Sequence, residues 1–396
     1  MTVSTEGWEN FKTNKWLFST PSSSYTIRPK SLIRRTSSEE APKLNGIESP
    51  SSRTNRPRTL SDRGNEILDR HEAVISLYAW KWSELNENYN EKGIHNPSIY
   101  CYAISCVQLL SHIPAVIRIL QEHRCQDPVC LACNWKKYFL QSNQSSGSIN
   151  WFKEAFKRDR KFNQGRQEDA HDALLSILGK IDKIASTIPR LKERKVADDL
   201  FGYSIRNEVI CKVCKTKHVY YENNTVMTVR MIKKDPTGKS ASIKDLMQQL
   251  FVNTIIFGYN CANCKKKSDA PVKPTLLRAP QILLLHISRF SFDGFGQKIS
   301  RPVKLNASID VSSMATGAAS TVYTLCGAVV HSGKSLDYGH YYCAARHRKR
   351  EHQFVMLNDS SVSSNTNVQD VQQSYIVLYR RAEHVETTST TDKSMI

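Results

Sequence analysis

Residues 96–110 read NPSIYCYAISCVQLL and place two cysteines five positions apart in an apolar segment. The spacing of its apolar residues predicts a buried helix that begins near Cys101 and contains Cys106. A thiol at the start of a helix lies beside unpaired backbone N–H groups and the positive end of the helix dipole, which favour the thiolate. A thiol inside an apolar helix lacks this support. This difference favours Cys101 as the reactive thiol and Cys106 as an inert core residue, but the stretch alone leaves open that both are small core residues.

The partners that a reactive thiol needs lie near the other end of the chain. Residues 323–346 read YTLCGAVVHSGKSLDYGHYYCAAR and predict two strands joined by a loop that His331 and His340 flank. A further apolar run, FVML, ends in Asn358 and Asp359. A cysteine, a downstream histidine and an Asn or Asp are the nucleophile, base and orienting group of a thiol hydrolase. Spacing alone leaves the pairing open, because the chain has 12 histidines.

Two Cys-x-x-Cys motifs lie in the middle of the chain, CKVC at 211–214 and CANC at 261–264. Each motif is typical of a tight turn that aims two sulfurs at one point, so the pair supplies four thiolates for a tetrahedral zinc. A closed set of four sulfurs has no open coordination position, which predicts a structural metal. We expect zinc to hold the ends of an inserted β-rich lobe, and the alternative is two unrelated pairs of buried cysteines. The predicted ligands are Cys211, Cys214, Cys261 and Cys264.

A second group of ligand types occurs in HRCQDPVCLAC, which contains His123, Cys125, Cys130 and Cys133. Only the last two cysteines have the spacing of a zinc-binding turn. A second zinc site therefore stays open beside the simpler alternative of a helix–loop segment whose cysteines pack or lie near the surface.

Composition divides the chain into four segments. Residues 1–62 are rich in Ser, Thr, Pro and Arg and predict a disordered basic arm, and residues 63–91 carry the apolar spacing of a helical lead-in. Residues 92–381 alternate apolar runs, charged helices and turn residues, as one mixed domain would. Residues 382–396 predict a flexible tail.

The charge and cysteine content narrow the functional classes. The formal net charge is +19, and residues 1–90 hold 13 Lys and Arg against 11 Asp and Glu, so nearly all of the excess lies downstream. A basic domain favours nucleic acid or another acidic partner, although surplus surface lysine explains the charge equally well. The sequence shows neither a membrane-spanning run nor a secretory signal, so we expect an intracellular chain whose 11 cysteines serve as metal ligands, catalytic groups or core residues.

Several segments, taken in order, resemble the ubiquitin-specific proteases. The nucleophile segment matches that family's cysteine box at Asn96, Cys101, Tyr102, Ser105 and Gln108. Further matching segments are RQEDAHDALLSIL at 166–178, the segment 276–305 that leads from fingers to palm, the histidine segment with the following LNDSSV, and SYIVLYRR at 374–381. The resemblance implies an α+β fold with a papain-like core and an inserted, zinc-stapled β fingers lobe. It divides the domain into a thumb at about 92–200, fingers at about 201–275 and a palm at about 276–381.

The resemblance also implies roles for single residues. Cys101 is the expected nucleophile, His340 its base, and Asn358 the orienting residue, with Asp359 beside it. Further expected contributors are Asn96, as a donor to the oxyanion, and Gln167 and Asp169, near the catalytic centre and the bound ubiquitin tail. The sequence departs from the family pattern at Ser98-Ile99-Tyr100, where small residues are customary before the cysteine.

The implied activity is that of a deubiquitinating thiol protease, which hydrolyses the peptide or isopeptide bond after the C-terminal glycine of ubiquitin on protein conjugates. The alternatives are an inactive ubiquitin-binding scaffold of the same fold and a zinc-dependent nucleic-acid-binding protein. Specificity for a ubiquitin-like modifier also stays open. The expected partners are ubiquitin and ubiquitinated proteins, the expected state is a monomer, and the resemblance favours the nucleus or nucleolus over the cytoplasm.

Overall fold

The structure is a computed structural model, and the residues that it describes belong to the unit of the chain at residues 57–396. The predicted arm, the tail after residue 382 and nearly all of the helical lead-in lie outside the described residues. The described residues are 80, 91–96, 98–140, 156, 162, 165–231, 241–289, 298–316, 321–333, 338–350, 353–366, 371 and 373–382.

An eight-stranded sheet forms the platform of the described fold. Its strands run in the order β11-β10-β9-β8-β12-β6-β3, with β7 paired to β8, and each pair is antiparallel except β3 with β6. The strands are β3 (Met227–Arg230), β6 (Ile282–Ser288), β7 (Ser308–Asp310), β8 (Val322–Ser332), β9 (His340–Arg346), β10 (Phe354–Asn358), β11 (Ser361–Thr366) and β12 (Ser374–Arg381).

The central strands of this sheet are buried on both faces. Along β12, Ile376 and Leu378 pack into one core cluster while Val377 and Tyr379 pack into another. This explains why SYIVLYRR reads as a continuous apolar run rather than an alternating one. The strands predicted from the apolar runs at 323–346 and at FVML are present as β8, β9 and β10. The segment SYIVLYRR, which only the family resemblance singles out, forms β12.

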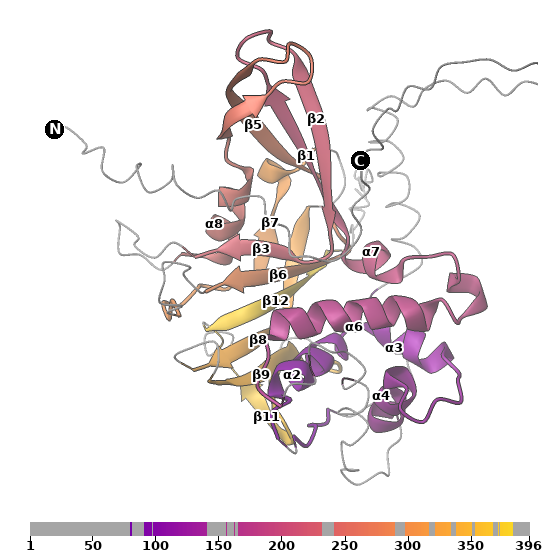
Figure 1. Ribbon diagram of the computed structural model, residues 1–396. Coiled ribbons are helices and arrows are strands. Elements are labelled where there is room, and N and C mark those ends of the chain that lie inside the picture. The colour runs from indigo at the N-terminus through magenta and orange to yellow at the C-terminus, as the bar shows by residue number, and fades with distance from the viewer. Residues whose placement is uncertain are drawn as a thin grey trace, which may run out of the picture. The chain divides into compact units, whose positions relative to one another are not determined.

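Helices cover one face of the sheet. The helix that carries Cys101, α2 (Cys101–Leu110), packs against β8, β9 and β10 and against α6 (Ala170–Ala185), as Figure 1 shows. Every residue of α2 is buried. The other helices of this face are α3 (Pro114–Glu122), α4 (Leu131–Leu140) and α7 (Val196–Phe201), whereas α8 (Ile243–Gln248) packs in the core cluster of the opposite face. The 3-10 turns are η4 (Pro189–Leu191), η5 (Gln249–Phe251) and η6 (Ser312–Met314).

Length and apolar composition decide whether a helix can span a membrane. No single described helix is long and apolar enough to cross a bilayer. Helices α2 and α3 together, bent by 96° where they meet, have the length and apolar composition of a span.

A separate four-stranded sheet forms the expected fingers. Its strands are all antiparallel, in the order β2-β1-β5-β4, and they appear together at the top of Figure 1. The turns that join β1 to β2 and β4 to β5 contain the two Cys-x-x-Cys motifs. The strand β5 runs through the predicted boundary between fingers and palm at residue 275. The strands are β1 (Tyr203–Ile210), β2 (Lys217–Asn224), β4 (Thr254–Asn260) and β5 (Lys267–Arg278).

Candidate active site

Cys101 is the first residue of α2, as the sequence predicts, and its residue is 1% exposed. No side chain caps this helix end, and the backbone N–H of Cys101 itself lies at the start of the helix, beside its thiol. The preceding turn is shaped by Asn96, whose Oδ1 accepts hydrogen bonds from the backbone N–H groups of Ser98 and Tyr100, each at 3.2 Å. Neither residue has a positive φ. The bulky segment before the cysteine therefore folds without left-handed backbone.

His340 begins β9 and lies between the thiol and an amide. Its Nε2 is 2.6 Å from Oδ1 of Asn358, which accepts the hydrogen bond and leaves Nδ1 for Cys101. The hydrogen bond with the Cys101 thiol raises the pKa of His340 to about 9; burial opposes this shift, and the bond to Asn358 and the charges of Cys101 and Asp359 add to it. The geometry places a readily protonated imidazole between the Cys101 thiol and the Asn358 amide.

Asn358 and Asp359 have different roles because β10 ends between them. Strand β10 pairs with β9 so that Leu357 lies opposite Cys343, which brings Asn358 close to His340. The nearest oxygen of Asp359 is 3.8 Å from Nε2, against 2.6 Å for Asn358. The structure thus makes Asn358 the direct partner of the imidazole.

The turn at Asp359 is fixed from two sides. Asp359 has a φ of 48°, and its backbone carbonyl accepts hydrogen bonds from Ile94 N at 2.6 Å and from Gln108 Nε2 at 2.9 Å. Its carboxylate accepts a bond from Asn96 Nδ2 at 3.3 Å. Because Gln108 belongs to α2, one helix carries the nucleophile and also positions the turn that orients the base. Sequence reasoning matched Gln108 to a motif but gave it no role.

Gln167 joins the histidine strand to the nucleophile. Its Nε2 donates to the carbonyl of Gly339 at 2.8 Å, and its Oε1 accepts from the N–H of Gly339 at 3.2 Å. The same Nε2 lies 3.9 Å from Sγ of Cys101. Gln167 therefore holds the residue before His340 and presents an amide to the reacting sulfur.

Asp169 lies beside this centre but makes contacts within the fold. Its Oδ1 accepts from the N–H of His171 at 2.7 Å, which caps α6, and its Oδ2 accepts from the hydroxyl of Tyr375 at 2.6 Å. Burial raises the pKa of this carboxyl. Both oxygens thus connect α6 to β12, and contact of Asp169 with a substrate stays a prediction.

Two other candidates from the sequence lie in the core. His331 is buried with its ring centroid 4.5 Å from that of Tyr341, and burial, with the nearby Lys298, Arg289 and His340 cations, lowers its pKa to about 4. Cys106 is also buried, its thiol donates to the carbonyl of Ala170 at 3.3 Å, and burial raises its pKa. A neutral enclosed imidazole and a protonated enclosed thiol do not form a catalytic pair.

The four cysteines of the fingers converge on one point. Their sulfurs all lie within 4.8 Å of one another, with Cys211 3.9 Å from Cys264 and Cys214 3.7 Å from Cys261. These separations suit a closed tetrahedral set of thiolates.

The two turns that present these sulfurs have the same backbone. In each turn, the backbone carbonyl of the first cysteine accepts a hydrogen bond from the N–H of the residue four positions on, Lys215 or Lys265. The backbone N–H of the same cysteine donates to the carbonyl five positions on. Both lysines have a positive φ, 61° and 58°. Two turns of the same shape therefore present the four sulfurs as the two halves of one metal site.

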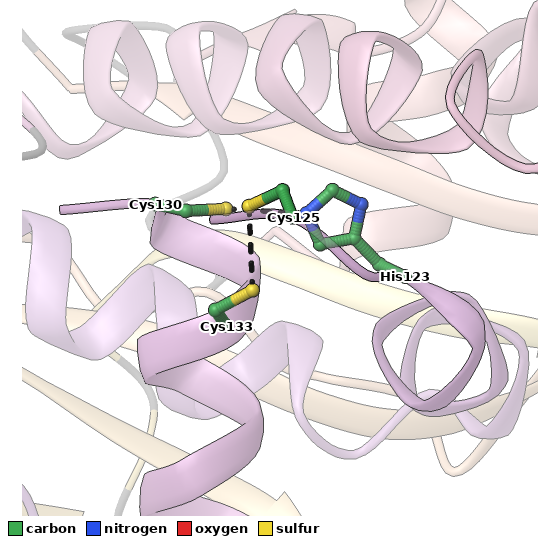
Figure 2. A group of neighbouring side chains, drawn as sticks. All are labelled: His123, Cys125, Cys130 and Cys133. Atoms are coloured by element: carbon green, nitrogen blue, oxygen red, sulfur yellow. Dashed lines mark hydrogen bonds between the residues drawn. The ribbon is translucent and has the colours of Figure 1, made fainter. Parts of the chain in front are cut away.

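The second group of candidate ligands also comes together in the fold. The ligand atoms of His123, Cys125, Cys130 and Cys133 all lie within 4.8 Å of one another, although only two of these residues have the sequence spacing of a zinc-binding turn (Figure 2).

Comparisons with known proteins agree with this geometry. Residues 92–379 match the family described as "Ubiquitin carboxyl-terminal hydrolase". The chain is 27% identical over 359 residues to the probable ubiquitin carboxyl-terminal hydrolase 16 of Schizosaccharomyces pombe, covering 82% of this chain and 75% of that protein. It is 28% identical over 340 residues to ubiquitin carboxyl-terminal hydrolase 25 of Arabidopsis thaliana, covering 76% of this chain and 49% of that protein.

Other relatives are longer, and solved structures share the fold. Identity to ubiquitin carboxyl-terminal hydrolase 36 of Drosophila melanogaster is 30% over 317 residues, covering 73% of this chain but 29% of that protein. The structure resembles a chain of the SAGA DUB module bound to monoubiquitin, with a TM-score of 0.64 and 19% identity over 79% of this chain and 75% of that chain. This likeness confirms the expected papain-like α+β fold. The chain belongs to the ubiquitin carboxyl-terminal hydrolase family.

Proposed function

We propose that this protein is a cysteine-type deubiquitinase that hydrolyses the bond after the C-terminal glycine of ubiquitin on protein conjugates. The observation that carries the proposal is the alignment of Cys101, His340 and Asn358 at a helix start and two strand ends, in a chain of this family. These are the nucleophile, base and orienting group of a thiol hydrolase.

The geometry gives each residue a step. The thiolate of Cys101 attacks the glycyl carbonyl carbon and forms a carbon–sulfur bond, and the imidazolium of His340 gives its proton to the leaving amine as the carbon–nitrogen bond breaks. Water then replaces the amine, and His340 removes a proton from it. The oxygen of this water forms a carbon–oxygen bond with the glycyl carbon as the carbon–sulfur bond breaks, which releases the ubiquitin carboxyl group and restores the Cys101 thiolate and the His340 imidazolium. Asn358 accepts from Nε2 throughout, so Nδ1 remains directed at the sulfur.

The oxyanion formed in the attack needs donors close to the sulfur. The backbone N–H of Cys101, at the start of α2, is one donor, and the amide of Gln167, 3.9 Å from Sγ, is another. Asn96 is the third donor to the oxyanion, and its amide nitrogen also donates to Asp359 in the resting structure. Its Nδ2 carries two hydrogens, so one can stay with Asp359 while the other donates to the developing oxyanion.

A ubiquitin-binding scaffold is the second candidate, and the bulky Ser98-Ile99-Tyr100 segment favours it. The ordinary backbone of Ser98 and Tyr100 and the intact hydrogen bond between His340 and Asn358 favour catalysis instead. A fluorogenic amide of ubiquitin separates the two. Hydrolysis by the full chain that Cys101→Ala abolishes supports the enzyme, whereas ubiquitin binding without hydrolysis supports the scaffold.

The metal and the cellular setting complete the proposal. We infer that the four finger cysteines hold zinc, because a closed set of four thiolates suits a structural Zn²⁺. The resemblance to nuclear members of the family supports a nuclear location, which microscopy of a tagged full chain tests. The net charge of +19 supports an acidic partner, and a binding affinity for RNA that falls steeply with salt would establish nucleic acid as that partner.

A further inference from the structure

A second group of metal-ligand side chains lies between helices α3 and α4. His123 caps the C-terminal end of α3, Cys125 lies in the loop that follows, and Cys130 and Cys133 flank the start of α4. Figure 2 shows their side chains converging. The Sγ atoms of Cys125 and Cys133 are 3.5 Å apart, and Sγ of Cys130 is 3.3 Å from Nε2 of His123.

These separations fit a metal better than a disulfide. Zinc–sulfur bonds of about 2.3 Å and zinc–nitrogen bonds of about 2.0 Å in a tetrahedron imply separations of about 3.8 Å between sulfurs and about 3.5 Å between sulfur and nitrogen. A disulfide would bring two sulfurs to about 2.0 Å. All three cysteines are free thiols in the structure. The set is therefore close to the size that a tetrahedral zinc needs.

The tautomer of His123 is fixed in the form that a metal ligand requires. The hydroxyl of Thr187 donates its one hydrogen to the carbonyl of Ile184 at 2.7 Å, so its oxygen can only accept from Nδ1 of His123 at 2.8 Å. The proton consequently lies on Nδ1, and Nε2 presents its lone pair toward Cys130. An outer partner that fixes the ring in this way is typical of metal-bound histidine.

The loop between the ligands is held by its own hydrogen bonds. The N–H of Cys130 donates to the carbonyl of Asp127, and the N–H of Val129 donates to the Asp127 carboxylate, each at 3.1 Å. On the far side, the amide nitrogen of Asn134 donates to the carbonyl of Cys130 at 2.9 Å. This bonding presents Cys130 and Cys133 in a preformed turn, which lowers the entropy cost of binding an ion.

The charges around the group also suit a bound zinc. Three thiolates and one neutral imidazole around Zn²⁺ carry a net charge of −1. The cations of Arg124 and Lys136 both donate to the carbonyl of His123 at 2.9 Å, so positive charge lies against the site. These cations offset the negative charge of the complex.

We propose that His123, Cys125, Cys130 and Cys133 bind a second zinc ion, which fastens α3 and α4 to the end of α6. A closed Cys₃His set leaves no open coordination position, so the ion is structural. By fixing α4, the ion also stabilises the end of the catalytic helix α2. The buried Trp135 of α4 donates from Nε1 to Oγ of Ser111, the C-cap of α2, at 2.9 Å.

Zinc analysis of the purified full chain and its variants tests this site. We expect two zinc ions per wild-type chain and one in Cys125→Ala, because Cys125 is exposed and its loss removes a ligand with little packing. The matched control is Cys326→Ala, which removes a buried thiol outside both groups and should keep two ions. Cys211→Ala should also fall to one ion, and a Cys125→Ala, Cys211→Ala double variant to none.

Cobalt provides a second measurement that does not depend on stability alone. A Cys211→Ala, Cys261→Ala variant reconstituted with Co²⁺ should show the visible bands of a tetrahedral Cys₃His site, and Cys125→Ala should remove them. One zinc per wild-type chain, unchanged in Cys125→Ala, would overturn the proposal. A disulfide between Cys125 and Cys133 in the protein as isolated, with one zinc before and after reduction, would overturn it too.

Discussion

The imidazole of His340 lies between the amide of Asn358 and the thiol of Cys101, and this orientation directs Nδ1 at the sulfur. Asn358 lies 2.6 Å from Nε2, whereas the Asp359 carboxylate lies 3.8 Å away and accepts a bond from Asn96. A neutral amide in this position orients the ring without adding a full negative charge next to the thiolate. Asp359 contributes mainly through its backbone carbonyl, which Gln108 and Ile94 hold.

The first prediction separates the two neighbours by mutation. Asn358→Ala should lower kcat/KM by about 10²-fold, the cost of a misplaced catalytic group. Asp359→Asn should cost less, and it is a better comparison than Asp359→Ala because the φ of 48° suits asparagine and strains alanine. Hydrolysis of a fluorogenic ubiquitin amide measures both. If Asp359→Asn proved the more damaging change, Asp359 would be the orienting group.

The pH profile follows from the raised pKa of His340. Attack needs the thiolate and protonated His340 together, so kcat/KM should fall as the pH rises through about 9, where His340 loses its proton. Asn358→Ala removes one cause of the raised pKa and should move this alkaline limb to lower pH. A variant with reduced activity but an unmoved limb would show that Asn358 does not act on His340.

The same shift has a consequence for stability. A folded-state pKa raised from 6.5 to about 9 stabilises the fold fully below pH 6.5, and this contribution is lost as the pH rises through about 9. Because the His340 side chain is 39% exposed, solvent screens the effect and it should be small.

A glycine beside the catalytic turn gives the third prediction. A Cβ on Gly93 would lie 2.2 Å from the carbonyl oxygen of Ser360, so Gly93→Ala must move the segment that carries Asn96 or the turn at Asp359. We expect a clear loss of turnover with the fold retained. Gly179→Ala in α6 is the matched control, since its Cβ meets nothing within 4 Å and should stabilise by about 0.5–1 kcal/mol. Equal activity of the two variants would contradict the close packing at this turn.

The finger sheet depends on links at both of its ends. At its outer end the two cysteine turns converge, and at its base Arg278 of β5 makes a two-pronged ion pair with Asp198 of α7 at 2.7 and 3.1 Å. The Arg278 side chain is 5% exposed and the Asp198 side chain 28%, so the cation is buried while the carboxylate still meets solvent. The sheet between these links has only a small core of its own, formed by Val209, Ala270 and Val272.

Metal removal is the fourth prediction and follows from this small core. A Cys211→Ser, Cys261→Ser double variant should lose one zinc per chain and unfold at a lower temperature, because the binding free energy of such a site is largely folding free energy. Inductively coupled plasma analysis and thermal unfolding measure both effects. Undiminished zinc in a soluble double variant would reject these ligands.

Elements with a strong local signal were predictable from the sequence, and contacts between distant segments were not. The helix that begins at Cys101 and the strand β8 follow from local apolar patterns, which one segment contains by itself. The bond from Gln108 to Asp359 joins residues 251 positions apart and depends on how α2 packs on the sheet. The second metal group stayed open for the same reason, because the loop and Thr187, not sequence spacing, bring His123 to the cysteines.

The whole centre is assembled from segments that the eight-stranded sheet holds in place. The nucleophile comes from α2, the base from β9, the orienting amide from β10, and the Gln167 clamp from just before α6. Because α2 packs on β8, β9 and β10, burial of one apolar helix fixes the distance between sulfur and imidazole. The central claim is therefore that the fold activates Cys101 and not Cys106, although both are cysteines of α2 and only five positions separate them.

Reaction of the full chain with ubiquitin that carries a C-terminal electrophile tests this claim most directly, with intact mass and peptide mapping as the readout. We predict a single adduct at Cys101, no adduct in Cys101→Ala, and a wild-type adduct in the control Cys106→Ala. Cys106 should stay unlabelled because it is fully buried and burial raises its pKa. Labelling at Cys106, or a wild-type chain that binds ubiquitin yet never forms the adduct, would contradict the account.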